Sequence, residues 1–333
     1  MIIVGIVGNE ELVSFKRRFL LLLNYKDNEI KYQIAKKSFL YDIIITDSYT
    51  INESYQYKKI IFELPDNILY SPISWYKFWY KILYFIKILI LKNKLESKLL
   101  KFDYIITGSK LQKKAYLKIH SKVDYIVDPI VDSLVIVKKI SKINCNKVNL
   151  GLECGGLNIH SILNNLGFVD AIKQMDNIVL HIIIDDEVLP NRYQYTKVHK
   201  ELKKVFSDKV VLYGWSKENY ITLMNLIDIA VIPVDENSNF ANTKPENRPL
   251  IMMSNMKPVV CSPILSYREN LSKFSTCFFA KTKDEWINKI NTIIEFPKSK
   301  TTKELINNAL LIKKEHNKNN FINFHNQCIK DLI

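Results

Sequence analysis

Residues 210–233 read VVLYGWSKENYITLMNLIDIAVIP, and this stretch decides the fold class. An apolar run at 210–213 is followed by a segment of helical period at 217–226 and by a second apolar run at 229–233. Parallel strands cannot be joined by a tight turn and need a crossover, which is usually a helix. The stretch therefore predicts one strand–helix–strand unit of a parallel sheet.

The same alternation extends in both directions and predicts an α/β protein. A polar stretch without a strand at 133–147 separates two sets of such units, so we expect two Rossmann-like domains, 1–135 and 146–300, with a helix at 301–333 that packs back on the first. The predicted strands are residues 2–7, 43–46, 59–63, 104–107, 123–127, 148–151, 178–184, 210–213, 229–233, 258–261 and 277–280. The predicted helices are residues 10–25, 75–101, 110–119, 159–174, 195–206, 217–226, 248–255 and 283–294.

Composition excludes several classes of protein. With 47% hydrophobic residues and only 8 Gly and 10 Pro in 333 residues, the chain is neither collagen-like nor disordered. The chain has 48 Lys and Arg residues and 34 Asp and Glu residues, a net charge of +14, which favours anionic partners. The Ile-, Asn- and Lys-rich composition explains part of this excess, so the charge alone identifies no partner.

The cysteine spacing argues against a zinc site and a disulfide framework, and the first residues argue against a signal peptide. The 5 cysteines form no C-x-x-C pair, so neither a zinc site nor a disulfide framework is expected. The start, MIIVGIVGNEE, lacks the basic region of a signal peptide and predicts a buried strand. We therefore expect a cytoplasmic protein.

The order of segments around 210–233 resembles a known family. A loop, DENSNFANTKPENR at 235–248, and the segment PLIMMSNMKPVVCSPILSYREN at 249–270 follow it, as in the nucleotide-sugar domain of GT-B glycosyltransferases. DYIITGSKLQKKAYLK at 103–118 and DYIVDPIVD at 124–132 resemble the end of the acceptor domain of that family. The resemblance implies a GT-B fold, in which two Rossmann-like domains face each other across a cleft and a C-terminal helix crosses back.

Lys244 and Arg248 are the first candidates for binding the donor phosphates. They are four residues apart at the entrance of a predicted helix, whose free N–H groups also attract anions. The alternative is that both are solvated loop cations. A second candidate is the turn containing Gly155, Gly156 and Asn158, because adjacent glycines allow close approach of the backbone to a ligand and Asn158 can cap the next helix.

Two positions depart from the family pattern. Ile251 occupies the position at which many retaining members carry a glutamate that binds the nucleotide ribose. Lys257 occupies the position at which the family usually has a glycine before PVV. Glu246 is close enough in sequence to substitute for an earlier acid, and with Asn247 it completes the candidate donor-binding residues. These departures leave the donor nucleotide and the stereochemistry of transfer open.

On the acceptor side, Asn9, Glu10 and Glu11 follow the first predicted strand at its carboxyl end, where ligands bind in this architecture. Glu10 is the candidate general base for an acceptor hydroxyl. The alternative is that these acids only complement a helix dipole. Asp47 and Asp66 are further candidates of the same kind.

Residues 75–101 predict a basic amphipathic helix, with lysines in one sector and Trp75, Trp79 and aliphatic residues on the other. Such a helix can lie on an anionic membrane surface, or it can be an ordinary core helix with a solvated lysine face.

The combined hypothesis is a transferase that moves a sugar from a nucleotide-sugar to a hydroxyl of a glycan or lipid-linked acceptor in cell-surface polysaccharide biosynthesis, at the inner face of the membrane. No bound cofactor, no divalent metal and no nucleic acid partner are expected. The alternatives are a GT-B-fold nucleotide-sugar epimerase and a non-catalytic basic scaffold that binds membrane or nucleic acid.

Overall fold

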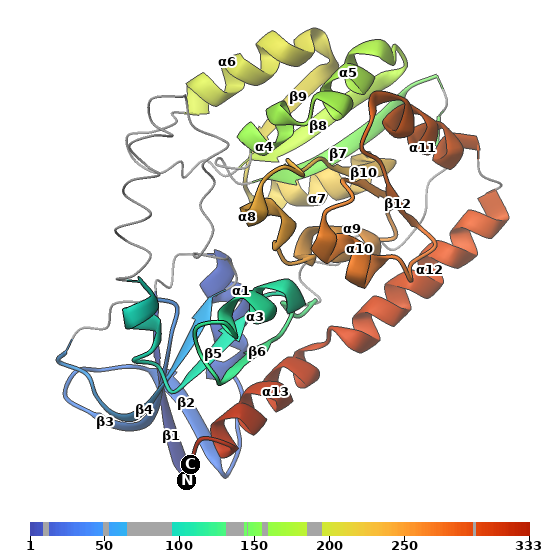
Figure 1. Ribbon diagram of the computed structural model, residues 1–333. Coiled ribbons are helices and arrows are strands. Elements are labelled where there is room, and N and C mark those ends of the chain that lie inside the picture. The colour runs from blue at the N-terminus through green and yellow to red at the C-terminus, as the bar shows by residue number, and fades with distance from the viewer. Residues whose placement is uncertain are drawn as a thin grey trace. The chain divides into compact units, whose positions relative to one another are not determined.

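A computed structural model describes residues 1–8, 13–48, 53–64, 95–130, 143–144, 146–154, 159–184, 195–295 and 298–333. The chain forms two compact units. Unit 1 contains Met1–Val131, Asn242–Pro245 and Glu315–Ile333, and unit 2 contains Asp132–Ala241 and Glu246–Lys314. Each unit is built on a six-stranded sheet flanked by helices (Figure 1), which confirms the predicted α/β class.

In unit 1 every strand pair is parallel, and the order across the sheet is β2-β1-β3-β4-β5-β6. The strands are β1 (Ile2–Val7), β2 (Ile30–Ile34), β3 (Leu40–Thr46), β4 (Gln56–Leu64), β5 (Tyr104–Thr107) and β6 (Val123–Tyr125). Among the described residues of this unit, the helices are α1 (Val13–Leu23), α3 (Lys110–Tyr116) and α13 (Lys318–Lys330), with a further helical turn near residues 95–99.

Unit 2 repeats the architecture with the order β12-β11-β10-β7-β8-β9, again entirely parallel. Its strands are β7 (Val148–Cys154), β8 (Ile178–Ile184), β9 (Val210–Gly214), β10 (Ile229–Ile232), β11 (Val259–Cys261) and β12 (Cys277–Phe279). Its helices are α4 (Ile159–Asn164), α5 (Leu166–Gln174), α6 (Tyr195–Phe206), α7 (Lys217–Leu226), α8 (Asn239–Asn242), α9 (Asn247–Ser254), α10 (Leu265–Leu271), α11 (Lys283–Glu295) and α12 (Lys298–Glu315), with a 3-10 turn at Ser207–Lys209.

Alternate residues of the strands build the apolar cores. On one face of the first sheet, Val4, Ile43 and Ile61 pack with α1 and with Phe321 and Ile329 of α13. On the other face, the neighbouring strand residues pack with residues 99–102 and α3. In unit 2, β7 and β8 form a core with α4, α5, α6 and α11. Because both faces of each sheet are covered, the strands are nearly continuously apolar, as parallel strands require.

The structure adds elements that the sequence did not predict. β2 was missed, and the predicted helix 159–174 is two helices that meet at Asn165, whose side chain accepts from the N–H of Phe168. Helix α10 was also missed. The C-terminal segment contains two helices, α12 and α13, and Asn317 caps the second.

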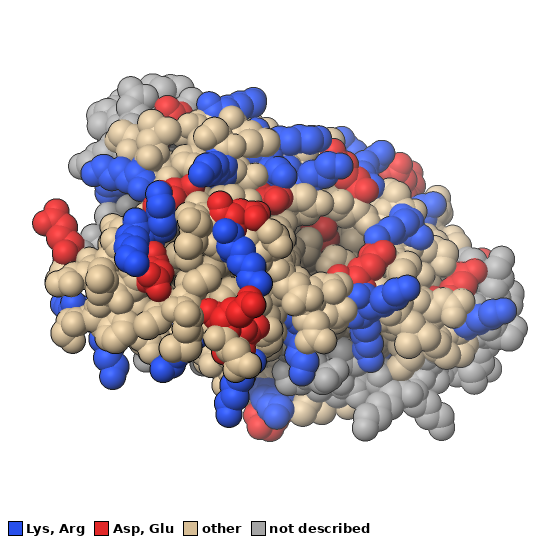
Figure 2. Space-filling view, turned by 90° about the horizontal axis from the view of Figure 1, so that it is seen from below, with Lys and Arg blue, Asp and Glu red and all other residues tan. Residues whose placement is uncertain are grey.

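Positive charge is not concentrated in one patch on the face shown in Figure 2, where Lys and Arg side chains alternate with Asp and Glu over the residues that are drawn in colour. Of the helices that the structure describes, none combines the length and apolar content that crossing a bilayer requires. Most of the predicted amphipathic helix, residues 75–94, lies outside the described residues.

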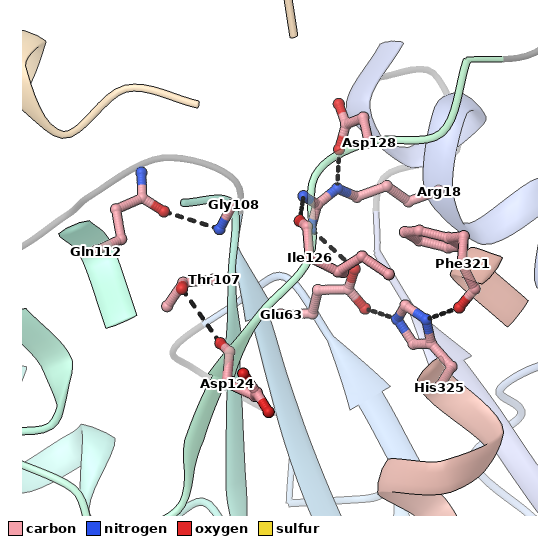
Figure 3. Close-up of polar contacts among 10 residues, drawn as sticks. All are labelled: Arg18, Glu63, Thr107, Gly108, Gln112, Asp124, Ile126, Asp128, Phe321 and His325. Carbon is pink, nitrogen blue, oxygen red and sulfur yellow. Dashed lines mark hydrogen bonds and ion pairs between the residues drawn. The ribbon is translucent and has the colours of Figure 1, made fainter. Parts of the chain in front are cut away.

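A buried cluster of four charged side chains joins distant parts of unit 1 (Figure 3). Arg18 of α1 donates from Nη1 to Oε1 of Glu63 at 2.8 Å and from Nε to the carboxylate of Asp128. Nε2 of His325, on α13, lies 2.8 Å from Oε2 of Glu63, and Nδ1 lies 2.9 Å from the carbonyl oxygen of Phe321. Burying these groups is tolerable only because they satisfy one another.

The protonation of the cluster follows from its partners. Burial alone would raise the pKa of Glu63, but the positive charges of His325 and Arg18 and their hydrogen bonds hold it below its usual value, so the carboxylate is ionised. The two ring nitrogens of His325 each lie within hydrogen-bond distance of an oxygen, one of Glu63 and one of Phe321, so the ring is held at both ends.

We predict that Glu63→Gln destabilises the protein by about 3 kcal/mol or more at pH 7, because it removes the buried carboxylate that Arg18 and His325 share. Since the folded-state pKa of Glu63 is depressed, its contribution is complete above the ordinary value of about 4.3 and is lost as the pH falls through the lower folded value. Urea unfolding of wild type and variant should therefore give a difference that is constant near neutrality and shrinks below about pH 4.

Glu29→Gln is the matched control, because Glu29 also pairs with α13, through Lys330, but from an exposed position. Solvent screens that pair, so its loss should leave the stability almost unchanged. Equal effects of the two substitutions would contradict the role assigned to the buried cluster.

Candidate functional site

The strand order of unit 2 marks a place for a ligand. From β7 the chain proceeds through β8 to β9 in one direction, whereas β10, β11 and β12 lie in the other direction. The connections at the carboxyl ends of β7 and β10 therefore diverge, and in open parallel sheets such a switch point is where ligands bind. The residues just after these two strands, and the helices that follow them, form the candidate donor site.

Buried hydrogen bonds fix the carboxyl edge of this sheet. Asn165 donates from Nδ2 to the carbonyl oxygen of Val234, just after β10, at 3.1 Å and to Oγ of Ser262, just after β11, at 2.8 Å. Oγ of Ser262 also accepts from the N–H of Val234 at 2.9 Å. Because one amide group bonds two neighbouring strand ends and also caps α5, the edge has a defined geometry.

The segment after β10 is also held by α4. The N–H of Asp235 donates to Oγ of Ser161 at 2.8 Å, and the carboxylate of Asp235 accepts from the N–H of Asn237 at 3.1 Å. Asp235 is therefore engaged in an Asx turn that shapes the loop before α8.

The start of α9 carries a cation and an acid around a buried tyrosine. Glu246 is the N-cap residue and is buried, Asn247 is the first helical residue, and Arg248 is half-buried in the first turn. Burial raises the pKa of Tyr267, on α10, and the positive charge of Arg248 opposes this rise. The N–H groups of the first helical turn and the guanidinium of Arg248 can both serve an anionic ligand.

Lys244 belongs to a different part of the structure. The short stretch Asn242–Pro245, although it directly precedes α9, groups with unit 1, so Lys244 is assigned to unit 1 and Arg248 to unit 2. The carbonyl oxygen of Thr243 accepts a 2.8 Å hydrogen bond from Oγ of Ser109, at the start of α3. The pair that is adjacent in sequence is thus divided between two structural units.

The two departures from the family pattern have different structural outcomes. Ile251 is buried in α9 and carries no polar group toward a ligand. The assignment of the family's glycine to Lys257 is corrected, because the left-handed backbone that favours glycine occurs one residue earlier, at Met256 (φ 54°). Lys257 itself precedes β11, at the amino end of the sheet, and donates from Nζ to the carbonyl oxygen of Ile227 at 2.7 Å; burial lowers its pKa to about 8.

The first sheet also has a switch point, between β1 and β3, because β2 lies on the outer side of β1. Asp47 directly follows β3 at this edge and is half-buried. Burial raises the pKa of the Asp47 carboxyl, and the negative charge of Glu63 adds to the rise. A raised pKa makes a carboxylate a stronger base, so Asp47 is suited to accept a proton.

Other predicted site residues lie outside the described residues. They are Asn9, Glu10, Glu11, Asp66, Gly155, Gly156 and Asn158. Within the parts of the chain that are described, there is no cluster of three or more His, Cys, Asp and Glu side chains that could hold a metal ion.

Sequence reasoning missed Ser109, Asn165, Ser262 and Tyr267. A signal was present for one of them, because Ser109 and Gln112 have the spacing of a capping box, which identifies the first turn of α3. The bonds of Asn165 to Val234 and Ser262 join residues 69 and 97 positions apart, and such pairings have no local signature.

Comparison with known proteins gives matches in structure alone. No family model matches the sequence, and no curated protein matches it. A glycosyltransferase from Rickettsia africae ESF-5 is similar over 99% of this chain and 98% of its own, with a TM-score of 0.66 and 13% identity. HepE from Anabaena, in complex with UDP and glucose, gives a TM-score of 0.66 and 13% identity over 99% of both chains.

Sucrose-phosphate synthase from Thermosynechococcus elongatus is similar over 88% of this chain and 74% of its own, with a TM-score of 0.64 and 13% identity. At this level of identity the similarity establishes the fold. It confirms the expected GT-B fold, with its two Rossmann-like parallel sheets.

We predict that Asn165→Asp destabilises the protein by about 1–3 kcal/mol at pH 8. The variant keeps the oxygen that caps α5 but loses the donor to Val234 and Ser262 and buries a charge. The loss should be smaller at pH 4, where a protonated carboxyl regains a donor, and unfolding in urea at both pH values measures it.

Asn317→Asp is the control, since Asn317 caps α13 through an oxygen at a more exposed site and an acid there suits the helix dipole. Its stability should be unchanged or slightly higher. If Asn165→Asp behaved like this control, the role assigned to the amide donor would be wrong.

Proposed function

We propose that this protein is a glycosyltransferase that transfers a sugar from a nucleotide-sugar donor to a hydroxyl group of an acceptor. The observation that carries the proposal is the near full-length structural similarity to HepE, which was crystallised with UDP and glucose and with UDP-glucose. The switch point of the second sheet supports it, because a nucleotide needs a crevice at the carboxyl edge with N–H donors and cations nearby.

The donor is bound by unit 2. Its phosphates lie at the start of α9, where helix N–H groups and Arg248 neutralise the charge that develops on the leaving nucleotide. Lys244, four residues earlier in the chain, is the second candidate cation. Glu246 and Asn247 orient the donor beside Arg248. Gly155, Gly156 and Asn158, which follow β7 in the sequence, are the candidates for close approach of the backbone to the donor.

The acceptor is bound by unit 1. Asp47 is the first choice for the base that takes the proton of the acceptor hydroxyl, because its place at the switch point and its raised pKa both suit that task. Asn9, Glu10 and Glu11 follow the neighbouring strand β1, and Asp66 follows β4, so their positions in the chain place them after the carboxyl ends of these strands.

The acceptor class is a glycan or a lipid-linked glycan of the cell surface, and the reaction takes place at the cytoplasmic face of the membrane. What supports this is the basic amphipathic pattern of residues 75–101, which suits an anionic lipid surface.

A panel of nucleotides tests donor binding. We expect one of UDP, GDP, CMP, ADP and dTDP to raise the melting temperature of the purified protein by several degrees, because a ligand at 100 times its Kd adds about 2.7 kcal/mol. The panel is measured with and without magnesium. A flat response to every nucleotide contradicts the proposed function.

Charge neutralisation is tested by Lys244→Ala and Arg248→Ala. Each should lower kcat by two to three decades, equivalent to a loss of about 2–4 kcal/mol of transition-state stabilisation. Initial rates of sugar transfer from the donor that the panel identifies measure this effect.

Lys303→Ala, at an exposed position of α12, is the control and should keep the wild-type rate. Wild-type rates in both site variants would remove Lys244 and Arg248 from the site. Conversion of the donor into its own epimer without an acceptor would replace transfer with epimerisation.

A further inference from the structure

Ser109 is placed to control the position of Lys244. It is the N-cap residue of α3, and its hydroxyl makes two hydrogen bonds: Oγ accepts from the N–H of Gln112 at 3.2 Å and donates to the carbonyl oxygen of Thr243 at 2.8 Å. Both Ser109 and Thr243 are buried, so water does not compete for the bond. The two residues are 134 positions apart in the chain.

The geometry of the α3 cap is fixed independently. The N–H of Gly108 donates to Oε1 of Gln112 at 2.8 Å (Figure 3), which together with the bond from the N–H of Gln112 to Ser109 makes a reciprocal cap. A hydroxyl has a single proton, and here it points to Thr243 while a lone pair serves the helix. The orientation of the Ser109 hydroxyl is therefore fixed by its two hydrogen bonds.

The bond to Thr243 reaches Lys244 through the peptide unit. The carbonyl oxygen of Thr243 lies in one plane with the nitrogen and Cα of Lys244, because the peptide group is rigid. Holding that oxygen fixes the point from which the Lys244 side chain extends.

We propose that Ser109 is a positioning residue: its bond to the carbonyl oxygen of Thr243 holds the backbone from which the Lys244 side chain extends to the donor phosphates. This inference rests on the proposed function, because it assigns Lys244 to the donor phosphates.

The attachment itself is tested without any activity. Hydrogen exchange of the peptide that contains residues 242–246 should become at least tenfold faster in Ser109→Ala. It should stay at the wild-type rate in Ser109→Thr, which keeps both the donor and the acceptor. Gln112→Ala is the matched control, because it removes the bond from Gly108 and weakens the α3 cap without removing the Ser109 hydroxyl.

Kinetics test the role of the attachment. Ser109→Ala should lower kcat by about 10- to 100-fold, with a change in the KM for the donor of less than about threefold, and Ser109→Thr should restore the rate. In a Lys244→Ala background, Ser109→Ala should cause no further loss, because the cation that it positions is absent.

Three results would overturn the inference: equal exchange in Ser109→Ala and Gln112→Ala, a full additional loss in the Lys244→Ala background, or a wild-type kcat in Ser109→Ala. Failure of the proposed function has a different signature. The wild-type protein would then bind no nucleotide and transfer no sugar, whatever the exchange experiment gives.

Discussion

The buried pairing of Arg18, Glu63, His325 and Asp128 is the constraint on which the organisation of unit 1 depends. A carboxylate in the middle of a sheet core must have cationic partners, and Glu63 obtains one from α1 and one from α13. Apolar packing would allow α13 to slide or rotate over the sheet, because dispersion contacts have little directional preference. The bond between His325 and Glu63 is directional and ties α13 to β4, while the bond between His325 and the carbonyl oxygen of Phe321 orients the ring on its own helix.

The same principle operates at the carboxyl edge of the second sheet, with neutral groups in place of charges. The amide of Asn165 bonds the ends of two neighbouring strands, and the hydroxyl of Ser262 receives two donors. Parallel strands end at one edge, so every loop that could contact a ligand begins there. The strands determine where a site at this edge lies. The buried hydrogen bonds of Asn165 and Ser262 at the strand ends make it rigid.

Much of the architecture could be predicted from the sequence because it depends on local periodicity. The predicted ranges 2–7, 178–184, 195–206 and 217–226 coincide with β1, β8, α6 and α7. β2 escaped detection because Lys31 and Gln33 interrupt its apolar residues, as is usual for a strand at the edge of a sheet. The glycine position before β11 was misplaced by one residue because Met256, which adopts the left-handed backbone, is not a glycine.

The candidate site was less predictable than the fold. Lys244 and Arg248 were predicted because they are charged and close in sequence. The bond from Ser109 to the carbonyl oxygen of Thr243, just before Lys244, joins residues 134 positions apart, and no local pattern indicates it. The buried charges of unit 1 were missed for the same reason: each residue alone resembles an ordinary surface residue, and only the fold brings the opposite charges together.

The docking of α13 also has a consequence for biosynthesis. Glu63 and His325 are separated by 262 positions, and all of unit 2 is encoded between them. On the ribosome, the strands of unit 1 therefore emerge long before the helix that supplies the second cation and the apolar residues Phe321 and Ile329 of their core. Unit 1 is the first to be synthesised and the last to be completed, and unit 2 has its whole sheet available before α13 leaves the exit tunnel.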